Sequence, residues 1–577
     1  MIKKLLPFLG EYKIYALLSP LTIVGETVLE VIIPFLMAKI IDLGIMENDM
    51  QYVLKTGGLM VVMAGLALFF GAASGRFAAV AATGFAMNLR KGLFNKVQEF
   101  SFSNIDKYGT PSLITRLTTD VTNSQNVTMM MLRMLVRAPI MMICATCFAV
   151  YINAGLSLVF FVAVPLLAAG LSIIMSKAFP RFQIMLKNYD KLNAIVQENL
   201  TAIRVVKAYV REGEESEKFR QAAELLRDSQ RRAEKLVVFT MPMMQLVMYA
   251  SMVSIVWFGG NMIISETMKP GELMGFLSYV TQILMSLMMV AMVFISIVIS
   301  KASVGRILEV LDEEIDIKDD TKTCACPTEG ADGSVVFENV AFSYSGDTDN
   351  PALSAINLRI DSGETVGIIG GTGSGKSSLV QLIPRLYDVT SGRVLLGGID
   401  VRDYPVKDLR DKVAMVLQKN VLFSGTISDN LRWGDEDATD EELVEACKAA
   451  AAHDFITAFP EGYKTVLGQG GINLSGGQKQ RLCIARALLK TPGVIILDDS
   501  TSAVDTATDS KIRSALSEKL SNTTTIIIAQ RIASVMDADR IIVMDDGRID
   551  SVGTHEELLD SNTIYREVYE SQRKGVA

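Results

Sequence analysis

The sequence contains few histidines and cysteines, which are the residues that bind zinc and form disulfide bonds. Its 577 residues include two histidines and six cysteines, the latter being Cys144, Cys147, Cys324, Cys326, Cys447 and Cys483. No spacing among these cysteines fits a zinc site, and their number is too small for a disulfide framework. We therefore expect reduced cysteines in a protein that faces the cytosol.

Runs of basic residues and a cleavable leader are also lacking. The formal net charge is -8, and no cluster of Lys and Arg indicates nucleic acid as a partner. The first residues, MIKKLLPFLGEY, contain no small-residue cleavage site. They predict a retained basic segment rather than a signal peptide.

Apolar residues, in contrast, are abundant and occur in long runs. Of all residues 50% are hydrophobic, and the mean hydropathy of +0.31 is too high for an ordinary soluble protein of this size. A membrane-spanning helix needs about 20 apolar residues. Six stretches meet this need and predict six transmembrane helices, namely 14–45, 54–86, 127–151, 156–175, 237–264 and 273–299.

Two long polar stretches between these spans set the predicted topology. Residues 87–126 and 176–235 keep a helical pattern and carry many Lys and Arg, whereas the other connections are short. The positive-inside rule places these stretches and both chain termini in the cytosol. We interpret them as helices that continue beyond the bilayer, and the alternative is two soluble inserts. The predicted organisation is a membrane domain at 1–311, a polar linker at 312–332 and a second domain at 333–577.

The second domain contains a phosphate-binding loop between an apolar strand and a helix. The loop matches the G-x-x-x-x-G-K-[ST] pattern, and its residues are Gly370, Gly371, Thr372, Gly373, Ser374, Gly375, Lys376 and Ser377, adjoined by Ser378. Glycines let successive backbone N–H groups surround a phosphate. Lys376 would neutralise the phosphate oxygens and Ser377 would bind Mg²⁺. The flanking strand and helix make a chance match improbable. The predicted cofactors are therefore ATP and Mg²⁺.

A second apolar strand, 494–497, ends at Asp498. A carboxylate in this position can hold Mg²⁺ through water. The alternative is that Asp498 caps the helix that follows. The phosphate-binding loop upstream favours the metal role.

Between these two motifs lies LSGGQKQRLCIARAL, at 474–488. LSGGQ resembles the signature of ATP-binding cassette proteins, and the whole chain resembles a half-transporter of the type IV exporter fold. The resemblance implies an all-α six-helix transmembrane domain followed by an α/β P-loop nucleotide-binding domain. It also implies a dimer in which the signature of one subunit completes the ATP site of the other. The nucleotide-binding residues implied in the signature are Ser475, Gly476, Gly477 and Gln478.

Other motifs of the family occur in the expected order. The resemblance implies Tyr344 as the aromatic residue that stacks on adenine, Gln418 as the Q-loop residue at the catalytic site and Mg²⁺, and 502–505 as the D-loop. Residues 106–113 and 207–213 resemble the coupling helices that rest on the ATP-binding domains. The alternative for both is a simple helical hairpin tip.

Two residues depart from the family pattern at the predicted catalytic site. Efficient members place Glu after the Mg²⁺-binding Asp as general base, and this chain has Asp499, which is one methylene shorter. The family also uses a His after the next strand, and this chain has Gln530, which cannot carry a proton near neutral pH. Together they predict a site that binds ATP and hydrolyses it poorly, although drift in a working homodimer is an alternative. The pair resembles the degenerate-site subunit of heterodimeric multidrug exporters of the LmrC/LmrD type, whose partner keeps the Glu and the His.

Charged residues inside two predicted spans need an explanation. Glu26 and Glu30 form an i,i+4 pair, with Glu26 about 18 Å along the first span and thus near mid-bilayer. They could attract cationic substrates or be hydrogen-bonded between helices, and both interpretations stay open. Arg133 and Arg137 form another such pair, for which contact with lipid headgroups is the favoured interpretation.

The combined reading is one subunit of an ATP-driven exporter in the cell membrane. We expect it to move amphipathic or hydrophobic drugs from the cytosol or the inner leaflet, together with a second, homologous half-transporter. The many methionines in the spans give weak support to varied apolar ligands, since thioethers repack easily; packing and lipid contact are the usual explanation. Alternatives are a homodimeric lipid flippase, a siderophore importer of the same fold, and a regulatory subunit without turnover of its own.

Overall fold

The computed structural model describes residues 2–319, 333–347, 350–500, 504–520 and 522–574. The chain separates into two compact units. The first comprises Met1–Gln98 and Thr110–Glu313, and the second comprises Glu99–Gly109 and Glu314–Ala577. The short segment at residues 99–109 therefore belongs with the second unit, although it lies in the stretch that the sequence places in the membrane domain.

The first unit is entirely helical in its described part, because its long apolar runs can satisfy their backbone groups in a membrane only within each helix. Its helices are α1 (Ile2–Leu5), α2 (Lys13–Lys39), α3 (Met50–Gln98), α5 (Thr110–Thr115), α6 (Val121–Ile152), α7 (Leu158–Thr201), α8 (Ile203–Ala208), α9 (Glu212–Val237), α10 (Thr240–Ile264) and α11 (Pro270–Asp312). Shorter turns complete it, a 3-10 turn at Leu6–Tyr12 and π-helical turns at Ile40–Ile45 and Arg116–Asp120.

Five helical runs in the described part of the chain are long and apolar enough to cross a membrane. They are Met50–Gln98, Thr110–Ile152, Leu158–Thr201, Glu212–Ile264 and Pro270–Asp312. They contain four of the last five predicted spans, and the remaining one, 156–175, overlaps Leu158–Thr201 from residue 158 onward. The first predicted span corresponds to α2, which carries Glu26 and Glu30 and is not among these five.

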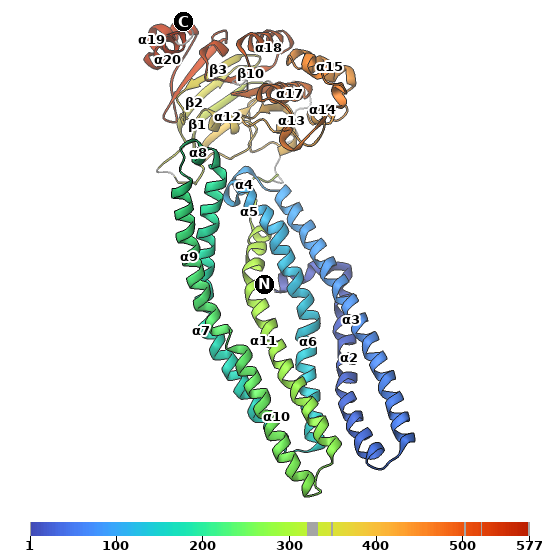
Figure 1. Ribbon diagram of the computed structural model, residues 1–577. Helices are drawn as coiled ribbons and strands as arrows, with labels where there is room; N and C mark the ends of the chain where they lie inside the picture. The colour runs from blue at the N-terminus through green and yellow to red at the C-terminus, as the bar shows by residue number, and fades with distance from the viewer. Residues whose placement is uncertain (1, 320–332, 348–349, 501–503, 521, 575–577) are drawn as a thin grey trace. The chain divides into compact units, whose positions relative to one another are not determined.

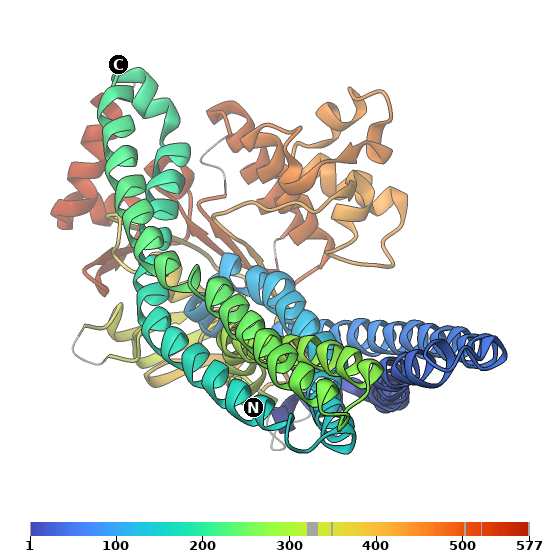
Figure 2. The same ribbon diagram turned by 60° about the horizontal axis from the view of Figure 1, so that its bottom comes forward.

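Several helices of the first unit are much longer than a bilayer is thick. At about 1.5 Å per residue, the 49 residues of α3 and the 44 of α7 reach roughly 74 and 66 Å. The hydrocarbon core of a bilayer measures about 30 Å. The predicted continuation of helices beyond the bilayer is thus confirmed for α3 and α7. In Figures 1 and 2, α2 and α3 run side by side, and α7 pairs with α9 and α10.

The core of the helical unit lies between α6, α7, α10 and α11. Phe160 of α7 stacks on Phe276 of α11 with ring centroids 5.8 Å apart, and the Tyr279 hydroxyl donates to the Val31 carbonyl of α2 at 2.9 Å. Met244 is buried in the same cluster. The packing interpretation therefore holds for this methionine.

The second unit is an α/β domain with short helices. Its strands are β1 (Val335–Phe342), β2 (Leu353–Ile360), β3 (Thr365–Gly370), β4 (Ser391–Leu396), β5 (Ile399–Asp400), β6 (Val413–Val416), β7 (Gly425–Thr426), β8 (Val466–Leu467), β9 (Val494–Asp498), β10 (Thr524–Ile528), β11 (Arg540–Asp545) and β12 (Arg548–Gly553). Its helices are α4 (Phe102–Tyr108), α12 (Lys376–Gln381), α13 (Val406–Lys412), α14 (Ile427–Leu431), α15 (Asp440–Ala449), α16 (His453–Thr457), α17 (Gly476–Leu489), α18 (Thr506–Lys519), α19 (His555–Ser561) and α20 (Thr563–Lys574).

Two larger sheets organise this unit, with a short β7–β8 ladder beside them. The first sheet has the antiparallel order β2-β1-β4-β5, and the second has the order β12-β11-β3-β10-β9-β6. In the second sheet, all neighbouring strands except β11 and β12 are parallel. The carboxyl ends of β3, β6, β9 and β10 therefore meet at one edge, where ligands of open α/β sheets usually bind. The predicted combination of a helical membrane domain and an α/β domain is confirmed.

Candidate functional site

A glycine-rich loop joins β3 to α12 at this edge of the sheet. Gly373 and Gly375 have φ values of +85° and +90°, which residues with a side chain rarely adopt. A Cβ added at Gly375 would lie 2.8 Å from Leu353 Cδ2, whereas one at Gly371 or Gly373 would meet nothing within 4 Å. The loop backbone at Gly371 and Gly373 is thus open, and Thr372 between them is exposed. Such a loop offers consecutive N–H groups to an anion.

Lys376 places its ammonium group inside this loop. Its Nζ donates to the carbonyl oxygens of Gly370 at 2.9 Å and Gly371 at 2.7 Å, and lies 3.3 Å from Ser374 Oγ. Burial lowers the pKa of Lys376, while the carboxylates of Asp498 and Asp499 oppose that shift. The lysine is thereby held where a phosphate surrounded by the loop would meet a positive charge.

The two predicted Mg²⁺ residues lie together. Ser377 Oγ donates to Asp498 Oδ1 at 3.1 Å, which joins the start of α12 to the end of β9. Asp498 is 2% exposed. Burial raises its pKa, the Ser377 hydrogen bond and Lys376 lower it, and Asp499 adds to the rise. A hydroxyl and a carboxylate are the oxygen ligands that Mg²⁺ prefers, so these residues fit the predicted ion, which would neutralise the buried carboxylate.

Asp499 and Gln530 contact each other directly. Gln530 Nε2 donates to Asp499 Oδ2 at 2.9 Å. Asp499 has a φ of +50°, in the left-handed region, and its N–H donates to the Ile528 carbonyl at 2.9 Å. Gln480 Nε2 lies 3.4 Å from the Asp499 carbonyl. The two residues that depart from the family pattern therefore form one hydrogen-bonded pair beside Asp498.

Tyr344 and Ser378 lie next to the loop. The Tyr344 hydroxyl is 2.9 Å from Ser378 Oγ and 3.4 Å from Gln381 Oε1. Tyr344 is 52% exposed, and its ring packs edge-to-face with Phe342 at 4.7 Å between centroids. An exposed ring fixed by its neighbours can serve as a platform for a base.

The remaining predicted site residues are not joined to the loop by hydrogen bonds in the described part of the chain. Gln418 is exposed, two residues beyond β6, whose neighbour in the sheet is β9. Ser475 caps α17, where its Oγ accepts from the Gln478 N–H at 3.3 Å and its N–H donates to Gln478 Oε1 at 2.9 Å. Gly476 and Gly477 form the first turn. Of the predicted D-loop at 502–505, the first two residues lie outside the described residues.

Comparison with known proteins decides the family. Residues 16–302 match the family described as the ABC transporter transmembrane region, and residues 353–502 match the ABC transporter family. An uncharacterized ABC transporter ATP-binding protein of Bacillus subtilis, YfiB, is 39% identical over 571 residues, which are 99% of this chain and 98% of that protein. The chain belongs to the ABC transporters. It is a multi-pass membrane protein with a fused ATP-binding domain.

Other relatives of this ABC transporter carry more specific names. An ATP-dependent lipid A-core flippase of Syntrophus aciditrophicus is 32% identical over 84% of this chain and 80% of that protein. YgaD of Bacillus subtilis, named as a candidate multidrug export ATP-binding/permease protein, is 33% identical over 84% of this chain and 83% of that protein. The structure of a bacterial Atm1-family ABC exporter with ATP bound matches with a TM-score of 0.80 at 26% identity and covers 98% of both chains.

Each predicted coupling segment of this ABC transporter spans the junction of two helices instead of forming a single helix. Residues 106–113 straddle the end of α4 and the start of α5, with Gly109 between them at a φ of +71°. Residues 207–213 cover the end of α8 and the start of α9. Only α4 groups with the ATP-binding unit in the division of the chain.

Arg137 forms ion pairs with Glu26 and Glu30, so the headgroup interpretation of Arg137 is wrong. Arg137 Nη1 donates to Glu26 Oε1 at 2.7 Å, and Nη2 donates to Glu30 Oε1 at 2.9 Å and Oε2 at 2.6 Å. One arginine of α6 therefore bridges both carboxylates of α2, because an unpaired charge in a bilayer is costly. The interhelical hydrogen-bonding interpretation of Glu26 and Glu30 is confirmed. Opposite i,i+4 charge pairs in two apolar spans were the signal that sequence reasoning missed.

The four cysteines in the described part of the chain are free thiols: Cys144, Cys147, Cys447 and Cys483. Cys324 and Cys326 lie outside the described residues. Burial raises the pKa of Cys447 to about 12 and also raises that of Cys483. Both thiols are thus protonated and packed in the ATP-binding unit, in line with a structural role.

Proposed function

We propose that this chain is one half of an ATP-driven exporter whose own ATP site hydrolyses slowly. Its partner in this proposal is a second, homologous half-transporter that supplies the missing Glu and His. The pair would lie in the cell membrane with both chain termini and the ATP-binding domains in the cytoplasm. The proposal rests on the family and on the residues beside Asp498.

The observation that carries the proposal is the hydrogen bond between Gln530 and Asp499. A general base must reach the attacking water, and an Asp is one methylene shorter than the Glu used for that purpose. Here the Asp499 carboxylate is also engaged by an amide at 2.9 Å. An amide cannot take up or release a proton near neutral pH. The pair therefore favours stable binding of ATP over rapid hydrolysis.

The signature supports a role for this chain at the partner's site. Ser475 and Gly476 are exposed, and the capping interactions of Ser475 and Gln478 hold the first turn of α17 in place. The free N–H groups of a helix N-terminus favour anions. An intact, exposed signature of this kind would complete the ATP site that contains the partner's loop, Glu and His.

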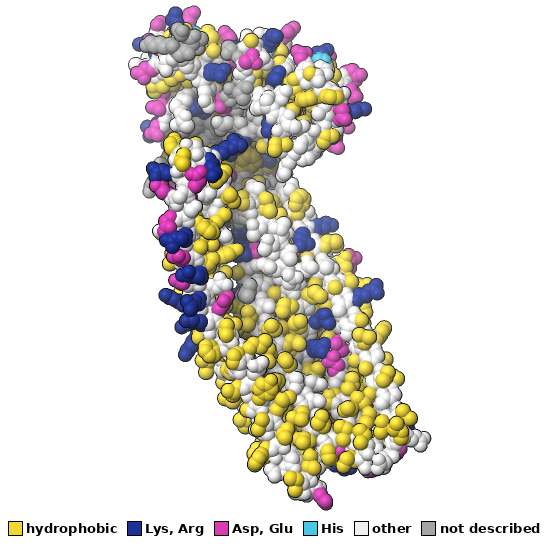
Figure 3. All heavy atoms as spheres, in the orientation of Figure 1, with side chains coloured by type: hydrophobic (Ala, Val, Ile, Leu, Met, Phe, Trp, Pro, Cys, Tyr) yellow, Lys and Arg dark blue, Asp and Glu magenta, His cyan; other side chains and the backbone are white. Residues whose placement is uncertain are grey.

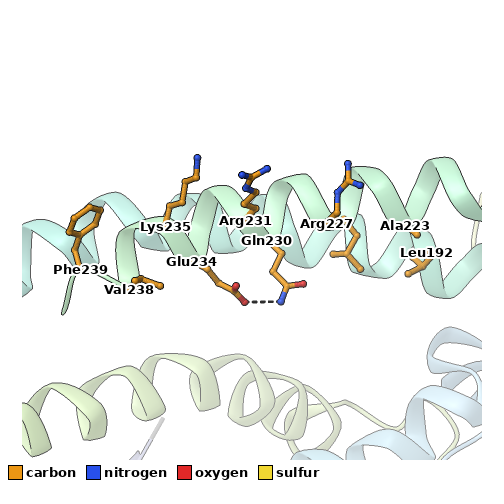
Figure 4. A pocket seen from close by; sticks show the side chains of 10 residues that line it. Leu192, Ala223, Arg227, Gln230, Arg231, Glu234, Lys235, Val238 and Phe239 are labelled. Carbon is orange, nitrogen blue, oxygen red and sulfur yellow. Dashed lines mark hydrogen bonds between the residues drawn. The ribbon is translucent and has the colours of Figure 1, made fainter. Parts of the chain in front are cut away.

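A groove on the pair α7 and α9 marks the face on which we expect the partner. It has a volume of about 690 Å³ and is lined by residues of these two helices and the two residues after α9. Figure 4 shows Arg227, Arg231 and Lys235 projecting on one side of α9, and Gln230 with Glu234 on the other. Figure 3 shows basic side chains in a row along an edge of the helical unit.

Large apolar side chains continue this face. Val238 and Phe239 are each 66% exposed, and Ala233 is the only residue classed as buried in α9. Val238 and Phe239 stand at the start of the fifth predicted span, 237–264, where an exposed apolar surface can meet either lipid or a partner subunit. A second half-transporter is the occupant that the family and the paired ATP sites support.

Amphipathic or hydrophobic drugs are the proposed substrates. The name of YgaD supports this class, and the methionines among α6, α10 and α11 give an adaptable apolar lining. A lipid flippase is the second candidate, supported by the relative named as a lipid A-core flippase. Transport of a fluorescent cationic dye and of a fluorescent phospholipid in the same proteoliposomes would separate the two.

Co-expression with a homologous half-transporter that keeps the Glu and the His tests the proposal. We expect a stable 1:1 complex with ATPase activity. Changing the partner's Glu to Gln should abolish that activity, because the competent site lies there. Asp499→Asn, the matched change in this chain, should leave most of it. Equal losses from the two changes would contradict unequal sites.

A further inference from the structure

Tyr387 contacts both the short helix α4 and the proposed adenine platform. It follows α12 in the chain and is 9% exposed. Its hydroxyl donates to Asp106 Oδ2 of α4 at 2.6 Å. Its ring meets Phe102 of α4 edge-on at 5.9 Å and Tyr344 at 5.2 Å with an interplanar angle of 88°. One buried side chain thus touches α4 and Tyr344 at once.

The helix α4 is fixed to the ATP-binding unit from a second side. The Ser101 and Ser103 hydroxyls donate to the carboxylate of Asp316, the first at 2.5 Å. Asn104 Nδ2 donates to the Glu314 carbonyl at 3.1 Å. The segment that follows α11 therefore crosses α4 and holds it. Because these hydrogen bonds hold α4 on its other side, α4 cannot simply follow a shift of Tyr387. Such a shift therefore changes the hydrogen bond between Tyr387 and Asp106.

We infer that Tyr387 is a positioning residue that links nucleotide binding at Tyr344 to α4 within the same chain. The inference rests on the proposed role of Tyr344 as the adenine platform. Tyr344 is 52% exposed and packs at right angles against Tyr387, so stacking of a base on Tyr344 fixes the ring against its neighbour. Aromatic pairs of this geometry have orientation-dependent energies, and the hydrogen bond to a carboxylate is stronger than a neutral one. The path does not involve Gln418 and is separate from the Q-loop.

The chain connects α4 directly to the membrane helices, so the link between Tyr387 and α4 can affect them. The helix α4 directly follows the end of α3 and precedes α5, which leads into α6. A change in how firmly α4 is held therefore acts on the ends of two membrane helices. In a subunit that hydrolyses slowly, bound ATP would hold α4 in one state for long periods.

Amide hydrogen exchange of the full-length chain in lipid nanodiscs tests the link. We expect saturating ATP to slow exchange of residues 102–108 at least threefold in the wild type. In Tyr387→Phe, which keeps the ring and removes the hydroxyl, ATP should bind with a Kd within twofold of wild type, and the slowing should fall by more than half. No ATP effect on these residues in the wild type, or an undiminished effect in Tyr387→Phe, would overturn the inference.

Three further variants make the result specific. Tyr404→Phe is the matched control, because Tyr404 is also buried and its hydroxyl donates to the Leu396 carbonyl of β4 at 2.9 Å. It should keep the full ATP effect. Asp106→Ala removes the same hydrogen bond from the α4 side and should reproduce Tyr387→Phe. Tyr344→Ala should weaken ATP binding. If the Kd of Tyr344→Ala for ATP equals that of the wild type, the assignment of Tyr344 as the adenine platform is wrong. The result for Tyr387→Phe tests the link to α4 separately.

Discussion

Asp498 and Asp499 are adjacent carboxylates with opposite environments. Asp498 ends β9, is buried and accepts a hydrogen bond from Ser377. Asp499 adopts a left-handed conformation, which Asp tolerates better than most residues, and pairs with Gln530. The first is placed to serve a metal ion and the second is restrained by an amide. At the scale of single residues, ATP binding and slow hydrolysis thus have separate causes.

Asp498→Asn should stabilise the protein while impairing Mg²⁺-dependent ATP binding. Burial raises the pKa of Asp498, so the ionised carboxylate opposes folding at pH values above its folded-state pKa. That opposition fades as the pH falls toward the unfolded-state value, where both states are protonated. Thermal unfolding without Mg²⁺ at neutral pH should show a raised Tm, and the gain should shrink at acidic pH.

The neighbouring change Asp499→Asn is the matched control for that measurement. Asp499 is only partly buried, whereas Asp498 is fully buried, so we expect little change in Tm at any pH. A Tm of Asp498→Asn at or below the wild-type value would show that the buried carboxylate is not a cost to folding.

At the scale of elements, α2, α3 and α6 are joined around paired charges. Arg137 of α6 bridges Glu26 and Glu30 of α2. On α3, a Cβ at Gly71 would lie 2.9 Å from Glu26 Cδ, whereas one at Gly75 would be no closer than 3.7 Å to the Arg133 guanidinium. The missing side chain of Gly71 therefore leaves the space that the Glu26 carboxylate occupies between the helices.

Gly71→Ala and Gly75→Ala should differ in their effect on stability. The first places a methyl group against the Glu26 carboxylate and forces it to shift, which costs about 1–3 kcal/mol for overpacking of this kind. The second adds ordinary van der Waals contact and gains helix propensity. Thermal unfolding in detergent micelles should show a lower Tm for Gly71→Ala alone. A similar Tm for both variants would contradict the close packing of α2 on α3.

Arg137→Met should destabilise the helical unit by about 3 kcal/mol, because two carboxylates then lack their cation. Adding Glu26→Gln and Glu30→Gln to Arg137→Met should recover most of the lost Tm, since the unpaired carboxylate charges are then removed as well. Arg76→Met, at an exposed arginine of α3, is the control and should have little effect. Failure of the triple variant to recover would indicate that Arg137 stabilises by packing rather than by charge.

At the scale of the whole molecule, sequence reasoning succeeded where a motif is contiguous. The loop between β3 and α12 was predicted because phosphate chemistry requires glycines and Lys376 at fixed spacing, and the strands β3 and β9 were predicted from their apolar runs. Contacts between residues distant in the chain were not predicted. Tyr387 meets Asp106 across 281 positions, and Arg137 meets Glu26 across 111. The Tyr387 contact has no sequence signal, because tertiary packing alone brings the two residues together. The Arg137 contact had one, the opposite i,i+4 charge pairs in two apolar spans.

The proposed partner face predicts an assembly defect. The double change Val238→Ser and Phe239→Ser removes exposed apolar area that lines the groove on α7 and α9. The fraction of this chain that co-purifies with the second half-transporter should therefore fall severalfold. Val552→Ser, at an exposed valine of β12, is the control and should leave co-purification unchanged. Undiminished assembly of the double variant would exclude this face.

The most direct test of unequal ATP sites is the ATPase rate of the purified chain by itself, reconstituted in nanodiscs at neutral pH with Mg²⁺. Loss of an effective general base typically costs about 10²–10⁴-fold in rate. We predict that the chain alone binds ATP but turns over at about one-hundredth or less of the rate of the co-purified pair. A rate for the chain alone that matches the pair would contradict the account.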